Sequence, residues 1–221
     1  MGTITRSFAN NITTSGVLLP ASLNNASLTN VTAYNASVAT GNMVLISSQT
    51  ASNSATVSFT SGIDSTYKEY QFWFIDIHPR TDTVDFTFNT STDSGSNYNT
   101  TKTTTAFYTY SFEDASQADK GYRSTWDLSQ STAFQKITVE AISSSATENL
   151  GGSMSLFNPA STTYVKHFIS NTSHYNREAV AKYNIGSWVA GYMNTTSAIN
   201  AVQFKMSSGN FDGTILMYGI K

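Results

Sequence analysis

The densest group of side chains able to bind a metal or move a proton follows one short stretch of the sequence. Asp76 and His78 are two positions apart, so on a β-strand they share one face. A carboxylate beside an imidazole can ligate a divalent cation. The alternative is a polar strand end, because Pro79 ends a strand and Asp82 and Asp85 suit the turn after it. The polar strand end is the stronger interpretation, so we predict no metal and no cofactor.

A second group, Ser91-Thr-Asp93-Ser-Gly95-Ser-Asn97-Tyr98, resembles an Asp box. In such a turn Asp93 accepts hydrogen bonds from the loop backbone, Gly95 supplies a positive φ, and Tyr98 packs under the hairpin. The chain departs from the motif at two positions, with Asn in place of Thr and Tyr in place of Trp. Asp boxes are structural turns in sialidases and other β-proteins, so we predict a structural role for these residues.

Catalytic motifs are absent from the sequence. A glycosidase needs two carboxylates at a set separation, and the five Glu residues lie in no motif that pairs them. There is no Gly-x-Ser-x-Gly elbow, phosphate-binding loop or His-Glu-x-x-His motif. The chain has no Cys, which removes thiol chemistry and Cys-based zinc sites. We therefore predict that the protein is not an enzyme and has no catalytic residues.

Exposed aromatic residues are the remaining candidates for function. Tyr and Trp on loops can stack on sugar rings or anchor protein contacts. Two long connections, residues 113–132 and 170–184, carry Tyr122, Trp126 and Tyr175, and we predict these three as surface-recognition residues. Most of the 12 Tyr must instead serve side-chain packing.

The composition excludes two classes of partner. Charged residues make up 12% of the chain, the net charge is −2, and the 12 Lys and Arg residues form no basic stripe. Because phosphate contacts dominate nucleic-acid affinity, we predict no nucleic-acid binding. No apolar run is long enough to span a bilayer, so we predict no membrane insertion.

The elements that would position these residues are β-strands. From residue 41 onward, apolar and polar residues alternate in short segments separated by Gly, Asn, Ser and Asp. The segments are 43–49, 55–60, 69–77, 84–88, 103–112, 134–142, 153–158, 164–169, 185–194, 199–206 and 213–220. We predict an all-β fold, an antiparallel β-sandwich or jelly roll of about ten strands.

In two segments, the pattern of apolar residues predicts whether one or both faces of the strand are buried. Residues 69–77 carry apolar side chains on both faces, which is typical of a central strand covered on each side. In residues 84–88, Phe86 and its neighbours alternate with Asp85 and Thr87, which predicts one solvated face.

Residues 1–40 differ from the rest of the chain. They contain Asn-Asn pairs, few aromatic residues and little periodicity. We predict an extended N-terminal attachment arm at 1–40 that lies on a neighbouring subunit, followed by a β-sandwich domain at 41–221. A loosely packed strand leading into the sandwich is the alternative.

Five stretches together carry a family resemblance. They are Gly2-Thr-Ile-Thr-Arg-Ser-Phe-Ala-Asn-Asn-Ile-Thr-Thr, Ser61-Gly-Ile-Asp-Ser-Thr-Tyr-Lys-Glu-Tyr-Gln-Phe, Leu156-Phe-Asn-Pro-Ala-Ser-Thr-Thr-Tyr-Val-Lys-His-Phe-Ile, Tyr192-Met-Asn-Thr-Thr-Ser-Ala-Ile-Asn-Ala-Val-Gln-Phe-Lys-Met and Gly213-Thr-Ile-Leu-Met-Tyr-Gly-Ile. In these stretches the chain resembles a family of structural proteins of tailed phages that infect marine bacteria, including cyanophages.

The resemblance implies a virion protein displayed on the particle surface, either a head decoration protein or a fibre-like appendage. It implies assembly in the host cytoplasm, as a homotrimer in contact with other virion proteins. It supplies no catalytic residues. The alternative function is a tail module that recognises a receptor or a glycan of the host cell surface.

Overall fold

The computed structural model describes residues 42–177 and 182–221, which form two antiparallel β-sheets and no α-helix. The prediction of an all-β sandwich is confirmed, with twelve strands where about ten were expected. The predicted arm, residues 1–40, lies outside the described residues.

The larger sheet has eight strands in the order β1 (Met43–Ser54), β12 (Phe211–Ile220), β3 (Glu69–Pro79), β8 (Leu150–Phe157), β9 (Lys166–Arg177), β10 (Lys182–Met193), β5 (Lys102–Phe112) and β6 (Ala118–Tyr122). The smaller sheet has four strands in the order β2 (Val57–Phe59), β11 (Ala201–Met206), β4 (Phe86–Ser91) and β7 (Gln135–Lys136). One short 3-10 turn, η2 (Ser124–Trp126), follows β6.

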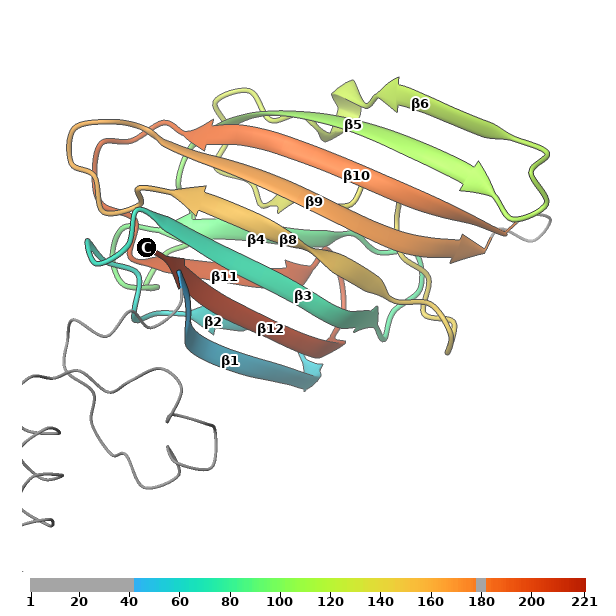
Figure 1. Ribbon diagram of the computed structural model, residues 1–221, viewed down its shortest axis with the longest axis horizontal. Helices are drawn as coiled ribbons and strands as arrows, with labels where there is room; N and C mark the ends of the chain where they lie inside the picture. Colours follow the sequence, from blue (N-terminus) through green and yellow to red (C-terminus); the bar gives the residue numbers. More distant parts are fainter. Residues whose placement is uncertain (1–41, 178–181) are drawn as a thin grey trace, which may run out of the picture. The chain divides into compact units, whose positions relative to one another are not determined.

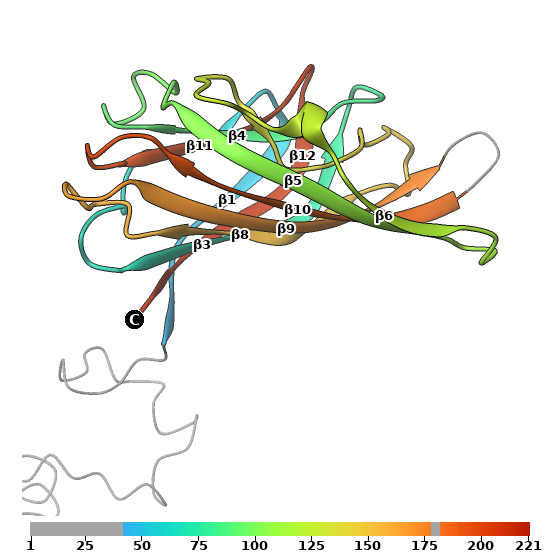
Figure 2. The ribbon, with the colours of Figure 1, turned by 90° about the horizontal axis from the view of Figure 1, so that it is seen from above.

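Figure 1 looks onto the larger sheet, with β2, β4 and β11 of the smaller sheet behind it. Figure 2 shows the smaller sheet as a second layer on one side. The chain passes between the sheets repeatedly, since β3, β4 and β5 belong to the larger, smaller and larger sheet in turn. The larger sheet therefore has one face toward the smaller sheet and one face away from it, which we name the outer face.

Phenylalanine rings fill the space between the two sheets. Phe204 of β11 lies at the centre of this core, with five neighbouring rings at centroid distances of 5.2 to 6.4 Å. These neighbours come from both sheets and are Phe59, Phe72, Phe74, Phe86 and Phe88. Burying one such side chain contributes about 2 kcal/mol, so this cluster is a main source of stability.

Two predictions about strand coverage are wrong. Residues 69–77 are covered on one face alone, because Trp73 and Ile75 point to the outer face and are 37% and 40% exposed. Conversely, β4 has no solvated face, because all six of its residues are buried. Most of its polar side chains find internal partners: the Thr87 hydroxyl donates to the carbonyl oxygen of Lys205 at 2.8 Å, and Asn89 Nδ2 donates to the backbone oxygen of Tyr98 at 2.7 Å. Uncharged hydroxyls thus permit burial that the alternation alone did not indicate.

The predicted connection at 170–184 is also wrong, because β9 and β10 continue as one hairpin. Their register pairs Lys166 with Met193 at one end and Arg177 with Lys182 at the other. The connection at 113–132 holds β6 and η2. Of the strand expected at 134–142, only β7 and one bridge between Val84 and Ile142 form.

Candidate binding sites

The outer face of the larger sheet carries most of the exposed aromatic and aliphatic side chains. Alternate residues of each strand point there, including Trp73, Ile75, Phe107, Ile169, Trp188, Tyr192 and Tyr218. The rings pair across strands: Phe107 stacks on Trp188 at 5.6 Å, and Trp73 lies 5.0 Å from Tyr218. Across residues 42–177 and 182–221 no third layer of strands or helices covers this face.

A hollow of about 520 Å³ indents the outer face across β9, β10 and β5. The hollow lies over Ala190 and Gly191, whose side chains are small or absent. Larger side chains such as Ile169 and Tyr192 border it. A Cβ on Gly191 would come within 2.5 Å of the backbone oxygen of Thr103, so the close approach of β10 to β5 requires glycine there. The hollow is therefore an apolar indentation of the outer face, suited to contact with another apolar surface.

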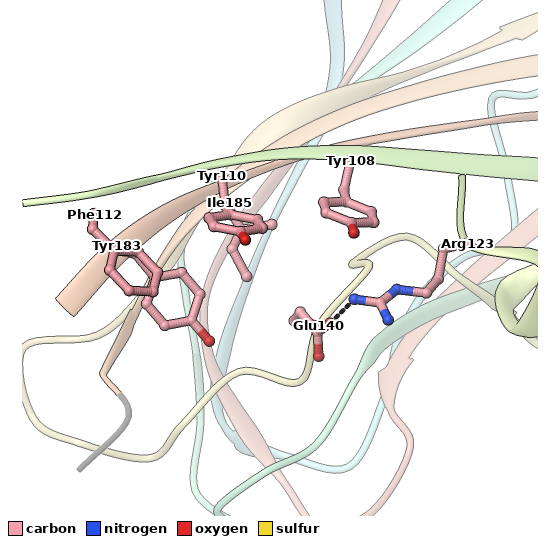
Figure 3. A pocket seen from close by; sticks show the side chains of 7 residues that line it. All are labelled: Tyr108, Tyr110, Phe112, Arg123, Glu140, Tyr183 and Ile185. Atoms are coloured by element: carbon pink, nitrogen blue, oxygen red, sulfur yellow. Dashed lines mark hydrogen bonds and ion pairs between the residues drawn. The ribbon is translucent and has the colours of Figure 1, made fainter. Parts of the chain in front are cut away.

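A second site, which we name the tyrosine pocket, lies on the inner side of β5 (Figure 3). It encloses about 210 Å³ and is lined by Tyr108, Tyr110, Phe112, Arg123, Glu140, Tyr183 and Ile185. Nearer the start of β5, the inward residues Thr104 and Ala106 are buried, and the Thr104 hydroxyl donates to Gln135 Oε1 of β7. Past Ala106 the inward side chains are half-buried, which leaves room for the pocket.

Two tyrosine rings form one wall of the tyrosine pocket. Tyr108 and Tyr110 are two positions apart on β5, and their rings are nearly parallel at 10°, with centroids 6.0 Å apart. Figure 3 shows them side by side along the strand, with Glu140 and Arg123 across the pocket from them. Phe112 and Tyr183 continue the aromatic wall beyond Tyr110.

An ion pair forms the opposite wall. Arg123 Nη2 donates to Glu140 Oε1, with each side chain about one-third exposed. The guanidinium also lies over the Tyr108 ring, 4.7 Å from its centroid, and 5.4 Å from that of Trp126. Cation–π contacts of this kind fix the Arg123 side chain over Tyr108 and leave the Tyr110 ring uncovered by it. Arg123 Nε is buried without a hydrogen-bond partner among the described residues.

The three predicted recognition residues have different surroundings. Tyr122 is 63% exposed and its hydroxyl donates to the Asp127 carboxylate, a bond that raises the pKa of the phenol. Trp126 is half-buried beside the tyrosine pocket, with Lys136 Nζ 4.3 Å from its ring centroid. Tyr175 is half-buried on β9, which β10 separates from β5. The structure therefore brings Trp126 to the pocket and places Tyr175 elsewhere.

The pocket residues Tyr110 and Glu140 were not singled out from the sequence. The alternation Tyr108-Thr-Tyr110-Ser-Phe112 does place three aromatic side chains on one strand face, which is the signal that could have found the aromatic wall. No pattern indicates that Glu140 faces Arg123, because both lie in irregular segments.

The Asp-box-like segment forms a turn closed by its own side chains. Asp93 accepts from the backbone and side-chain amides of Asn97 at 2.9 and 2.7 Å. Hydrogen bonds, first that from Ser91, lower the pKa of Asp93 to about 2. Gly95 has a φ of 87°, and the Tyr98 hydroxyl lies beneath it. These contacts describe a structural turn, and none of them leaves Asp93 directed at a cavity.

Asp76 and His78 make separate contacts. Asp76 accepts from Asn149 Nδ2 at 2.7 Å, and His78 Nδ1 lies 2.5 Å from the backbone oxygen of Glu148. Asp85 pairs with Lys136 at 2.9 Å. In the part of the chain that the structure describes, no three His, Asp or Glu side chains converge as metal ligands would.

The ionisable side chains buried away from both sites include Lys102, Lys166, His174 and Glu148. Lys102 and Lys166 stand on either side of Met193 in the larger sheet and donate to backbone oxygens at 2.7 to 3.1 Å. Burial lowers the pKa of both, that of Lys102 to about 7. Burial likewise lowers the pKa of His174 to about 4, and neither ring nitrogen of His174 has a hydrogen-bond partner among the described residues.

No family model matches the chain, and neither the curated proteins nor the solved structures include a match. Among the described residues no helix is long and apolar enough to cross a membrane. The geometry of the outer face and of the tyrosine pocket is therefore the basis for a functional proposal.

Proposed function

We propose that this chain is a non-enzymatic structural protein on the surface of a tailed-phage particle, as a head decoration protein or fibre-like appendage. The outer face of the larger sheet is the observation that carries the proposal. The resemblance to phage structural proteins supplies the setting, and the outer face supplies the surface through which the sandwich packs on its neighbours.

The neighbour that suits this face is another copy of the same chain. The face carries stacked aromatic pairs such as Phe107 with Trp188, and an apolar hollow bordered by Ile169, among mostly uncharged polar side chains. Soluble proteins rarely leave a large contiguous apolar patch exposed unless it is an interface. A homotrimer in contact with other virion proteins, the oligomer that the resemblance implies, would bury it.

A single charge placed on the outer face tests this function. Ile169 is 51% exposed on β9, so Ile169→Glu should leave the fold intact and introduce an unpaired carboxylate at the interface. The matched control is Ser208→Glu, which adds the same charge at an exposed position of the turn after β11. Each variant would complement a phage lacking this protein, and its amount in purified particles would be measured by quantitative mass spectrometry.

We expect Ile169→Glu to be lost from particles and to elute as a monomer in light-scattering chromatography. Ser208→Glu should be incorporated at the level of the unmodified protein. Equal incorporation of both variants would contradict the proposed interface.

A second function, recognition of a host-surface glycan, is favoured by the tyrosine pocket. Aromatic side chains beside convergent polar groups are the usual lining of small-ligand sites. In the pocket, Tyr110 supplies an open ring face and the pair of Arg123 and Glu140 supplies both donors and acceptors. The pocket and the outer face are on opposite sides of the larger sheet, so one protein can use both.

A further inference from the structure

The Tyr110 ring is the open part of the tyrosine pocket. Arg123 covers the neighbouring Tyr108 ring, so a ligand entering the pocket meets the face of Tyr110 first. Phe112 and Tyr183 stand beside it, tilted by 37° and 64° to its plane. A flat ligand with an apolar face can therefore stack on Tyr110 while its edge meets the side walls.

The cavity volume sets the size of that ligand. About 210 Å³ is less than the 300 Å³ at the lower end of sites for drug-sized ligands. The space suits a single six-membered ring, with the rest of a longer chain outside the pocket.

Polar atoms suited to hydroxyl groups line the other wall. Glu140 uses Oε1 for Arg123, and its second oxygen, Oε2, has no hydrogen-bond partner among the described residues. Tyr110 accepts from Gln117 Nε2 at 2.6 Å, and its own hydroxyl proton remains able to donate. A ring with several hydroxyl groups can both donate to Glu140 and accept from Tyr110.

The charge in the pocket selects a neutral ligand. Arg123 and Glu140 cancel one another, and the nearby Lys136 is paired with Asp85. An anion would meet the Glu140 carboxylate, and a quaternary ammonium would find the best cation–π position, over Tyr108, occupied by Arg123. A neutral sugar has neither difficulty.

We propose that the tyrosine pocket is a subsite for one neutral pyranose ring of a glycan, stacked on Tyr110 and hydrogen-bonded to Glu140. This inference rests on the second function above and names its residues and ligand class. It is independent of the interface on the outer face, because no residue of the pocket belongs to that face.

The test measures binding of defined small ligands to the full chain by saturation-transfer NMR and titration. The probes are the methyl pyranosides of glucose, galactose, mannose and N-acetylglucosamine, with glucuronate and choline as charged comparisons. At least one neutral pyranoside should bind, and Tyr110→Ala should weaken it about tenfold through loss of the stacked ring. Thr109→Ala, on the opposite face of the same strand, is the matched control and should bind as the unmodified protein does.

A second variant reports on charge and does not depend on the tolerance of β5 to truncation. Glu140→Gln leaves the Arg123 charge uncompensated, so binding of glucuronate should strengthen about tenfold through a charge-assisted hydrogen bond. A purely structural role of Glu140 would not produce that change in ligand preference. Thermal unfolding of each variant confirms that the chain is folded.

Three results would overturn the subsite. One is pyranoside binding that Tyr110→Ala and Glu140→Gln both leave unchanged, which places the sugar elsewhere and keeps glycan recognition as a function. Another is choline binding in place of pyranosides, which identifies an ammonium site. The third is no binding of any probe together with unchanged adsorption of phage carrying Tyr110→Ala, which removes the second function as well.

Discussion

Single residues in this sandwich show how burial acts on ionisable groups. His174 alternates with Ser173 and Tyr175 on β9, and the alternation directs its ring into the interior. Neither ring nitrogen has a partner there among the described residues, so the protonated ring would be a buried, unpaired charge. The imidazole is therefore neutral at pH 7, and its pKa of about 4 is the consequence.

This burial predicts a loss of stability in mild acid. The folded pKa of about 4 lies below the unfolded value of 6.5, so between these pH values the unfolded chain binds more protons. Stability is thus at its full value above pH 6.5 and falls as the pH is lowered toward 4. Between pH 7 and pH 4.5 we expect the free energy of unfolding to drop by about 2 kcal/mol on account of His174. Urea unfolding at the two pH values measures the drop.

His174→Phe removes the titrating group without leaving a buried polar atom, so it should reduce the acid loss by that amount. The exposed His167 provides the control, because His167→Phe should keep the whole loss. The same acid loss in His174→Phe and in the unmodified protein would show that other groups cause it.

Which residues form the candidate site was only partly predictable. Trp126 was identified from its type and its place in a long connection, and it does lie beside the tyrosine pocket. Tyr110 and Glu140 were missed for different reasons. The Tyr110 side chain looks like a core residue in the alternation, and only the limited extent of the smaller sheet leaves it half-buried. The meeting of Glu140 with Arg123 depends on tertiary structure that no local pattern records.

At the scale of elements, hydrophobic alternation located most strands and misjudged their lengths. β3 and β5, which are rich in aromatic residues, begin and end within two residues of the predictions. β9 extends eight residues past the predicted end, through Ser170-Asn-Thr-Ser-His. In this segment both the buried and the exposed side chains are polar, so no hydrophobic alternation marks it as a strand. Backbone pairing with β10 holds this part of the strand, and hydroxyls such as that of Thr172 find partners inside.

The turn after β4 offers a prediction at this scale. Gly95 has a φ of 87°, a conformation that costs a residue with a Cβ about 1–2 kcal/mol. A Cβ there would also lie 2.7 Å from the Tyr98 hydroxyl and 2.9 Å from Thr60 Cγ2. Gly95→Ala should therefore lower the free energy of unfolding by about 2 kcal/mol, measured by urea denaturation at pH 7. Gly151→Ala is the control, because its Cβ would meet a single backbone oxygen at 3.9 Å. Equal stability of the two variants would show that the turn relaxes around the added methyl group.

At the scale of the whole molecule, the strands that meet in space are far apart in the sequence. β1 pairs with β12, and β3 pairs with both β12 and β8. The larger sheet is therefore complete only when the strands from both ends of the described chain have paired. Sequence alone could predict a sandwich from the number and spacing of strands. It could not predict the order of strands or the unequal sheets of eight and four, because pairing over such separations leaves no local signature.

The last prediction concerns residues 1–40, which we predict to be an attachment arm. The buried hydrophobic residues of the described chain begin at Ala51, and the cluster around Phe204 comes entirely from residues 59–211. Deleting residues 2–40 should therefore leave the melting temperature within about 3 °C of the intact protein, whereas Phe204→Ala should cost about 4 kcal/mol. If residues 1–40 are an attachment arm, the same deletion should abolish incorporation into phage particles. Calorimetry of the purified deletion variant and its occupancy in purified particles measure the two effects separately. Unfolding of the deletion variant would mean that the arm belongs to the domain, and full occupancy in particles would mean that the sandwich attaches without it.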